Sequence, residues 1–168
     1  SYTDLGLLNL LSISKENSKV YEIRNSITKL YLIVQEIPTL KGFDSLEHLT
    51  ISIINENELK TKDLSRFGEL KNLKTLTIQI DKSRIEDQRP SWNEKKIVIS
   101  SIYGLKAPKL ENLIIMNLGI SDINSLNNCI ELSQLSLDEN EELEDINSLK
   151  NCSKLKILNL NKTSIKTC

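Results

Sequence analysis

The stretch "LENLIIMNLGISDINSLNNCIELSQLSLDENEELEDINSLKNCSKLKILNLNKTSI", residues 110–165, contains three copies of one pattern. Each copy opens L-x-x-L-x-[LI], at Leu110, Leu132 and Leu155, so that successive openings are 22 and 23 residues apart. The decapeptides INSLNNCIEL and INSLKNCSKL are near copies at the same phase of the repeat. A period of this length indicates a stack of similar units, each of which buries its apolar side only against its neighbours.

The same opening recurs upstream, at Ile27, Leu46 and Leu73, and in a weaker form at Leu5. The six firm openings are separated by 19, 27, 37, 22 and 23 residues. The two longest intervals predict insertions, a small one around residues 55–64 and a charged one near residues 81–101.

We expect residues 1–168 to form a single domain with six repeats over residues 27–168. Residues 1–26 are expected to be a cap or a degenerate first repeat, either one more strand in register or an apolar helix at the end of the stack. Because the sequence opens on Ser1 without an initiator Met and closes on Cys168 within an apolar pattern, we expect it to be part of a longer chain.

The alternation at the end of each opening predicts a short strand, because every second residue of a strand points to the same face. Stacked copies then form a parallel sheet over a continuous apolar core. The return segments are too short for regular helices, so we expect irregular structure or 3₁₀ turns behind the sheet. The predicted strands are Ile27–Leu32, Leu46–Ile51, Leu73–Ile78, Leu110–Ile115, Leu132–Leu137 and Leu155–Leu160.

Two further columns of core residues run through the return segments. The chain has 28 Leu and 22 Ile but one Ala and three Val, which is typical of a regular repeating geometry. Three residues before the openings stand Phe43, Leu70, Ala107, Cys129 and Cys152, and six residues before them stand Leu40, Phe67, Gly104, Leu126 and Leu149.

The pattern resembles that of the leucine-rich repeat superfamily, L-x-x-L-x-L-x-x-N/C-x-L. It is most similar to the short Sds22-like and internalin-like repeats, whose second half reads I-x-x-I-x-x-L. The resemblance covers residues 27–165 and implies an α/β-type solenoid, a horseshoe with a parallel concave sheet. Asn occupies the family's asparagine position only at Asn140, so a continuous ladder of Asn side chains is not expected. The equivalent positions hold Gln35, Ile54, Asp81, Leu118 and Thr163.

Charge and hydropathy exclude two classes of protein. Twenty-two Lys and Arg balance 23 Asp and Glu, which argues against a nucleic-acid binder with a strongly basic surface. No apolar run approaches the roughly 20 residues that cross a bilayer, so we expect no membrane insertion.

The acidic run DENEELED, residues 138–145, and the only histidine, His48, are the candidates for chemistry. An EF-hand loop needs Gly at its sixth position, where this run has Leu143, and the repeat needs that Leu for the core. We therefore interpret the run as a solvated turn. His48 has no nucleophile or orienting acid implied by the register and is interpreted as an exposed polar residue.

Cys129 and Cys152 share one column position in adjacent repeats. Such positions lie about one strand spacing apart, so a disulfide is geometrically conceivable. The simpler interpretation is two buried thiols, which favours a reducing, intracellular compartment. With no Cys-x-x-Cys pair and no Gly-rich phosphate loop, we predict a protein without enzymatic activity, cofactor or metal.

The remaining candidate site is the predicted concave surface, on which the strands display their non-core residues. These are Tyr31, Ile33, His48, Thr50, Ser52, Thr77, Gln79, Ile114, Met116, Ser136, Asp138, Asn159 and Asn161. We predict that a protein partner binds there, with Tyr31, His48, Thr50, Thr77, Ile114 and Met116 near its centre. Trp92, in the predicted insertion, is the rival anchor because Trp is frequent among hot spots.

The sequence therefore predicts a non-catalytic protein-interaction module, a scaffold or adaptor. Two alternatives follow from the resemblance: a regulatory or targeting subunit of an enzyme such as a phosphatase, and a secreted cell-surface adhesin. The oligomeric state is left open.

Overall fold

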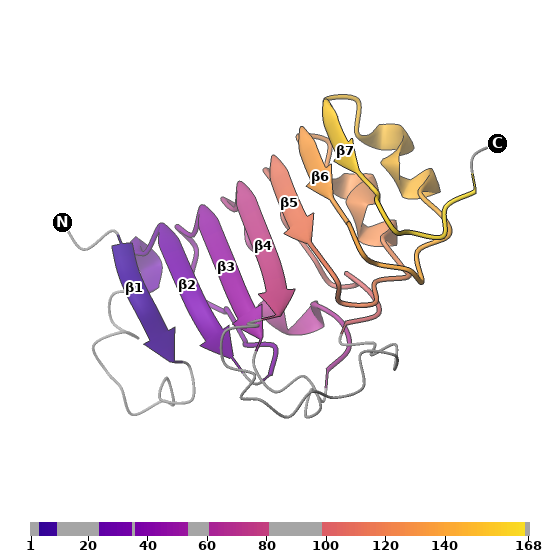
Figure 1. Ribbon diagram of the computed structural model, residues 1–168. Coiled ribbons are helices and arrows are strands. Elements are labelled where there is room, and N and C mark those ends of the chain that lie inside the picture. Colours follow the sequence, from indigo (N-terminus) through magenta and orange to yellow (C-terminus); the bar gives the residue numbers. More distant parts are fainter. Residues whose placement is uncertain (1–3, 10–23, 35, 54–60, 81–98, 167–168) are drawn as a thin grey trace, which may run out of the picture.

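Seven strands form one parallel sheet in which the spatial order is the chain order (Figure 1). The structure, a computed structural model, describes residues 4–9, 24–34, 36–53, 61–80 and 99–166. Because each strand pairs with the next one along the chain, the chain advances by one strand per turn and is a solenoid. The strands are β1 (Asp4–Asn9), β2 (Lys29–Val34), β3 (His48–Ile53), β4 (Thr75–Ile80), β5 (Asn112–Ile115), β6 (Gln134–Ser136) and β7 (Ile157–Asn159).

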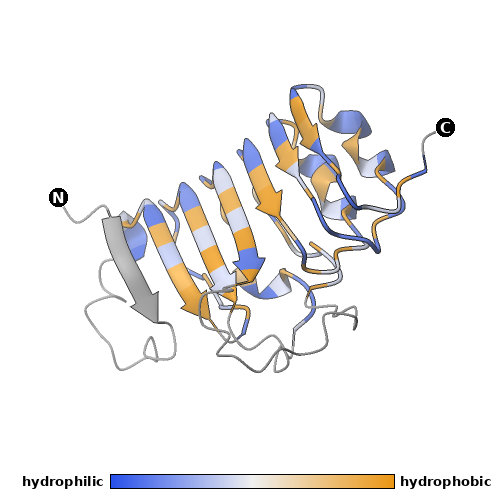
Figure 2. Ribbon diagram, viewed as in Figure 1, coloured by the Kyte–Doolittle hydropathy of each residue, from blue (hydrophilic) through white to orange (hydrophobic). Residues whose placement is uncertain are grey.

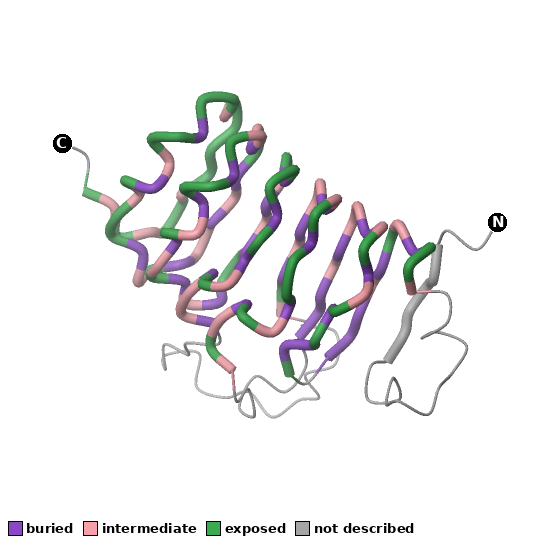
Figure 3. The backbone as a smooth tube through the Cα atoms, turned by 180° about the vertical axis from the view of Figure 1, so that it is seen from behind, coloured by how far each residue is buried: buried purple, intermediate pink, exposed green. Residues whose placement is uncertain are grey.

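The return segments lie together behind the sheet (Figures 1 and 3). Within the described residues their only regular elements are 3₁₀ helices, as expected for segments too short for α-helices. These helices are η2 (Arg24–Ser26), η4 (Ser65–Phe67), η6 (Asn124–Asn128) and η7 (Asn147–Asn151). None of the helices in these parts of the chain is long and apolar enough to span a membrane.

The strands begin two residues later than predicted. Leu46, for example, lies in a turn in which its amide donates to Phe43 O at 3.1 Å, and β3 starts only at His48. The first Leu of the later openings closes the same turn. This Leu is buried at every opening except the last, where Leu155 is partly buried, because the turn directs it into the core. An apolar residue at the start of an opening therefore predicts that this residue lies in the core, but it does not predict that the strand begins there.

Two columns of aliphatic residues on the strands belong to the hydrophobic core. Figure 2 shows hydrophobic and more hydrophilic residues alternating along the strands. The register places Leu135 between Leu113 and Leu158, and Leu135 is 1% exposed. The first column is Leu30, Leu49, Leu76, Leu113, Leu135 and Leu158, and the second begins Leu32, Ile51, Ile78 and Ile115.

The predicted columns in the return segments also pack into this core. The five predicted residues three positions before an opening, Phe43, Leu70, Ala107, Cys129 and Cys152, are all buried. Gly104, in the other column, has φ +85° and approaches η4 so closely that a Cβ would lie 2.3 Å from Ser65 Cα. The side chain missing from this column is therefore replaced by the backbone of the neighbouring turn.

From β2 onwards, each junction between consecutive strands is joined by a recurring backbone arrangement. The amides of the residue before a strand and of the strand's first residue donate to one carbonyl just before the preceding strand, as Lys74 and Thr75 do to Glu47 O at 2.8 and 3.0 Å. The carbonyls that accept in this way are those of Thr28, Glu47, Lys74, Glu111 and Ser133.

Asn140 supplies a side-chain bridge between β5 and the turn after β6. Its amide is fully buried, Oδ1 accepts from Leu118 N at 3.2 Å and Ile120 N at 3.0 Å, and Nδ2 donates to Ile115 O at 2.8 Å. The single Asn at this repeat position thus satisfies buried backbone groups of the preceding repeat.

For residues 1–26 the sequence left open a further strand or an apolar helix, and within this range residues 4–9 form a strand. Residues 4–9 form β1, which pairs with β2 in parallel, with a register shift between Leu5 and Leu8. Most of both predicted insertions, residues 54–60 and 81–98, lies outside the described residues, and Trp92 with them. The chain rejoins the stack at Ile99, which is buried and whose amide donates to Leu118 O at 3.0 Å.

Candidate interaction face

The strands align their non-core residues in rows on the side of the sheet away from the return segments, here called the open face. The register brings Tyr31 beside Thr50, and Thr50 beside Thr77. Neighbouring strands lie about 4.8 Å apart, so the row is a regular array of side chains. This middle row is Tyr31, Thr50, Thr77, Ile114, Ser136 and Asn159, and a second row is Lys29, His48, Thr75, Asn112, Gln134 and Ile157.

Most residues predicted for the partner site lie in these two rows. Tyr31, Thr50, Thr77 and Ile114 are half-buried members of the middle row, and His48 is half-buried in the second row. Met116 follows the last residue of β5 and is 40% exposed. Trp92 lies outside the described residues, so the rival site in the insertion has no structural counterpart here.

The expectation that Ile33 and Ser52 are displayed is wrong, because they are 5% and 1% exposed. The Tyr31 hydroxyl lies 2.9 Å from Ser52 Oγ, and Gln79 Nε2 donates to the same oxygen at 3.3 Å. These two longer side chains cover Ser52, and Ile33 is its register neighbour in the same row.

The Tyr31–Ser52–Gln79 network links β2, β3 and β4 across the open face. A side chain held by a hydrogen bond loses less rotamer freedom when a ligand contacts it. The network therefore holds the Tyr31 ring in place at the N-terminal end of the middle row. Sequence reasoning missed this network because a residue pattern shows neither side-chain reach nor donor direction.

Ionisable side chains on the open face are few. Lys29 and His48 lie in the second row, and Asp138 follows β6. Asp138 accepts from Ser136 Oγ at 3.3 Å and from Asn161 N at 2.8 Å, so its carboxylate is held by the protein's own donors. The two rows otherwise carry neutral polar and apolar groups, which suit a partner surface of low charge.

The acidic turn lies beyond this face. Leu143 is fully buried, as the repeat requires, and Lys162 Nζ contacts Glu139 Oε1 at 2.7 Å. The ion pair with Glu139 raises the pKa of Lys162. Within the described ranges no group of three or more His, Cys, Asp or Glu side chains is placed to hold a metal ion.

An ion pair lies just before the strands, where Lys74 Nζ contacts Glu47 Oε2 at 3.0 Å. The hydrogen bond from Lys74 and then its charge lower the pKa of the Glu47 carboxyl. Both side chains are more than a third exposed, so the pair is worth little to stability.

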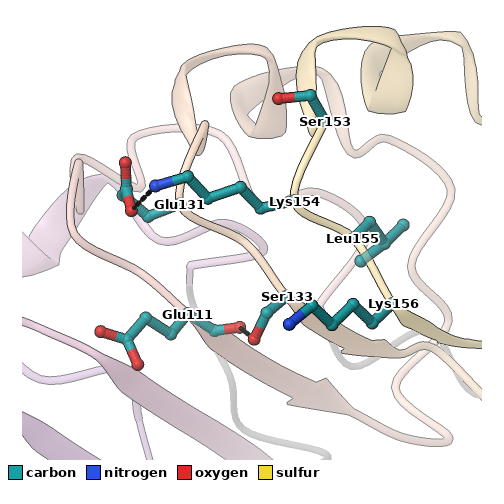
Figure 4. Close-up of a pocket in the computed structure, with 7 residues that line it drawn as sticks. All are labelled: Glu111, Glu131, Ser133, Ser153, Lys154, Leu155 and Lys156. Carbon is teal, nitrogen blue, oxygen red and sulfur yellow. Dashed lines mark hydrogen bonds and ion pairs between the residues drawn. The ribbon is translucent and has the colours of Figure 1, made fainter.

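A shallow depression of about 490 Å³ lies at the beginning of β5–β7 (Figure 4). In it, Lys154 Nζ contacts Glu131 Oε2 at 2.5 Å, and Ser133 Oγ donates to Glu111 O at 3.1 Å. The hydroxyl is thus engaged with a carbonyl, and no histidine lines the depression. It is a charged surface and not a nucleophile–base pair. Its lining residues are Glu111, Glu131, Ser133, Ser153, Lys154, Leu155 and Lys156.

Cys129 and Cys152 are free and buried. Cys129 Sγ lies 3.9 Å from Ala107 O, and Cys152 Sγ lies 3.6 Å from Leu126 O. Burial, with a smaller effect of Cys152, raises the pKa of Cys129 to about 11, and burial also raises the pKa of Cys152. Both groups are therefore neutral thiols and poor nucleophiles at neutral pH.

Sequence reasoning also missed the exposed apolar residues of the last strand. Ile157 is 49% exposed and Leu158 is 40% exposed, although Leu158 belongs to the core column.

Comparison with models of known protein families finds no match, and a search of curated proteins finds no significant match. The functional argument therefore rests on the geometry of the sheet.

Proposed function

We propose that the chain is a non-catalytic protein-interaction module of the leucine-rich repeat type that binds a protein partner through the open face. The observation that carries this proposal is the middle row, in which six residues of six strands stand in register from Tyr31 to Asn159. The face corresponds to the concave surface of the sequence prediction.

The physical support is pre-organisation. The row residues belong to a hydrogen-bonded sheet, so a partner that contacts them orders few additional groups. Ile114 is half-buried and lies in register between Thr77 and Ser136, and Met116, just after β5, is 40% exposed. Apolar residues with a polar surround, and few Lys or Glu near the centre, are typical of protein–protein interfaces.

The repeat type is supported by three features together. The openings coincide with successive parallel strands, the described return segments contain only 3₁₀ helices, and Asn140 bonds to the backbone of the preceding repeat. An α/β-type leucine-rich repeat horseshoe is the fold that combines them.

The test is capture of a protein partner by variants in which two side chains of the middle row are replaced by larger ones. Thr50→Arg/Thr77→Arg places two bulky cations in the middle row, and we expect it to lose the partner. The matched control is Thr39→Arg/Asn128→Arg, because both residues are exposed and lie outside the strands. A captured protein counts only after it binds the purified chain directly in calorimetry.

A third variant, Trp92→Ala, addresses the insertion. Loss of binding with this variant alone would move the site to residues 81–101. Equal binding by the parent, Thr50→Arg/Thr77→Arg and the control, all with unchanged circular dichroism, would refute the open face as the partner site.

A further inference from the structure

Strand β5 carries an apolar stripe on the open face, formed by Ile114 and Met116. These two residues alternate with Leu113 and Ile115, which are fully buried, so both face away from the core. Met116 is 40% exposed and Ile114 is half-buried. Because β5 has a strand on each side, the exposure of the stripe does not depend on where the sheet ends (Figure 1).

Asp138 lies beside this stripe. The register pairs Ile114 with Ser136. It continues past the ends of both strands, because Asn117 N donates to Asp138 O at 3.1 Å, and this sets Met116 next to Asp138. Ser136 Oγ donates to the Asp138 carboxylate, so these two side chains are on the same face of the sheet. The apolar stripe therefore adjoins a carboxylate on the open face.

The half-buried Asp138 carboxylate is held in place but is not neutralised. Its Oδ1 accepts from Asn161 N at 2.8 Å and its Oδ2 accepts from Ser136 Oγ at 3.3 Å. Among the described residues no Lys, Arg or His forms an ion pair with it, whereas Glu131 and Glu139 each contact a Lys of the next repeat. The charge of Asp138 is thus left for an external group.

The acceptor sites that remain on Asp138 match one kind of cation. An ionised carboxylate offers about four lone-pair sites, shared equally by its two oxygens. One site on each oxygen is occupied, so one site on each oxygen remains. A guanidinium binds both oxygens through two parallel N–H bonds, whereas an ammonium is a compact point charge. The remaining sites therefore favour Arg over Lys.

The apolar stripe suits the rest of an Arg side chain. Arg packs its aliphatic stem on apolar surface while its charged head stays at a polar site. Met116 is flexible and polarisable, and it lies about one strand spacing (~4.8 Å) from Asp138, so one side chain can contact both.

Charges elsewhere on the open face do not oppose a cation at this point. Lys29 and His48, the cationic residues of the second row, lie on β2 and β3, three or more strands away from β6. Four of the five residues 138–142 are acids. Such a local excess of negative charge attracts a cation from a longer distance.

We propose that Ile114, Met116 and Asp138 form a subsite for one Arg side chain of a separate protein. The guanidinium binds both oxygens of Asp138, and the Arg stem packs on Met116 and Ile114. This inference rests on the proposed function, since it names the partner side chain that the open face recognises. The partner surface around the Arg is of low charge, to match the two rows.

The test uses the intact chain and pools of short synthetic peptides as the probe. Each pool has Arg, citrulline, Lys or Glu fixed at its centre and neutral residues elsewhere. Citrulline keeps the shape of Arg without its charge. The peptide retained best from the Arg pool is remade with each of the other three central residues. Fluorescence anisotropy should show that the Arg peptide binds about tenfold more tightly than the citrulline and Glu peptides, with Lys between them.

Protein variants locate the contact. Asp138→Asn should weaken binding of the Arg peptide about tenfold and remove its advantage over citrulline. Asp44→Asn, the same change in charge at an exposed position outside the strands, should leave both affinities unchanged. Met116→Ser should weaken the Arg and the citrulline peptides alike, because it removes apolar contact with the stem and no charge.

Failure of the Arg subsite can be told from failure of the open face. If no pool yields a binding peptide, if the Arg and citrulline peptides bind equally, or if Asp138→Asn has no effect, the subsite is wrong. Loss of a peptide with Thr50→Arg/Thr77→Arg but not with Asp138→Asn would keep the open face and reject the subsite. Self-association that Asp138→Asn abolishes, seen in sedimentation, would place a second copy there and overturn the separate partner.

Discussion

The two halves of the sheet differ in strand length, although their repeats share one opening. Strands β2, β3 and β4 have six residues each, whereas β5 has four and β6 and β7 have three. The difference begins at the residue seven positions after each opening. In the first half that residue is Val34, Ile53 or Ile80, and it continues the strand.

In the second half the equivalent residues are Asn117, Glu139 and Lys162, with φ of 55°, 62° and 55°. Positive φ is accessible to Asn and tolerated by unbranched residues, but it is a strong outlier for β-branched ones. The strand-length difference therefore coincides with β-branching at a single position, and we expect the branching to be its cause. The chain leaves the sheet at Asn117 and Glu139, and the Asn140 side chain bonds to Leu118 N and Ile120 N in the segment that follows Asn117.

The largest expected effect is in the core column of the second half. Leu135→Ala should reduce the free energy of unfolding by about 2–5 kcal/mol, because Leu135 is buried between two stacked repeats. Leu158→Ala, the same change in the same column, should cost clearly less because Leu158 is already 40% exposed. Urea denaturation monitored by circular dichroism measures both, and equal losses would contradict the assignment of Leu158 to an open edge.

The bridge of the second half should be the next most costly to remove. Asn140→Ala leaves Leu118 N, Ile120 N and Ile115 O without their buried partner and should cost about 2–3 kcal/mol. Asn161→Ala, an exposed Asn one repeat later, is the control and should change stability by less than about 0.5 kcal/mol. If Asn140→Ala leaves the free energy of unfolding unchanged, the Asn140 hydrogen bonds do not stabilise the second half, and both halves depend on the same backbone and core contacts.

Alkaline pH should lower the free energy of unfolding, because the Cys129 thiol in the second half is buried. The pKa of this thiol is about 11 in the folded chain, against an ordinary value of 9.0, because burial disfavours the thiolate. Between these values the unfolded chain releases the proton and the folded chain keeps it, so stability falls as pH rises, by about 1 kcal/mol per pH unit.

Chemical denaturation at a series of pH values from 8 to 11 gives this slope. Cys129→Ala removes the titrating group, so its slope should be shallower than that of the parent even though the variant is less stable throughout. Identical slopes for the two proteins would mean that other groups control the alkaline loss.

Periodicity predicted the stack, the parallel strands and the core columns, because these follow from which residues are apolar at a fixed spacing. It misplaced the strand starts, since the first Leu of an opening is buried whether it lies in a turn or a strand. It wrongly assigned Ser52 to the surface. Periodicity within one strand does not show that Tyr31 and Gln79, on the two neighbouring strands, reach over Ser52 and cover it. The middle row could be predicted because register alone determines it.

The smallest expected effect tests the origin of the strand-length difference directly. Asn117→Val puts a β-branched residue at φ 55° and should cost about 1–2 kcal/mol, because the branched side chain collides with the backbone in the left-handed region. The matched control, Asn159→Val, makes the same change in β7, where the conformation is extended and Val is a good strand residue. Asn159→Val should be neutral within about 0.5 kcal/mol. Thermal unfolding measures both, and hydrogen exchange adds a second readout: if Val relaxes the strain by extending β5, amides beyond Ile115 gain protection. If Asn117→Val is as stable as Asn159→Val and leaves exchange unchanged, branching at this position does not set strand length, and the cause of the early turn lies in the segment that follows.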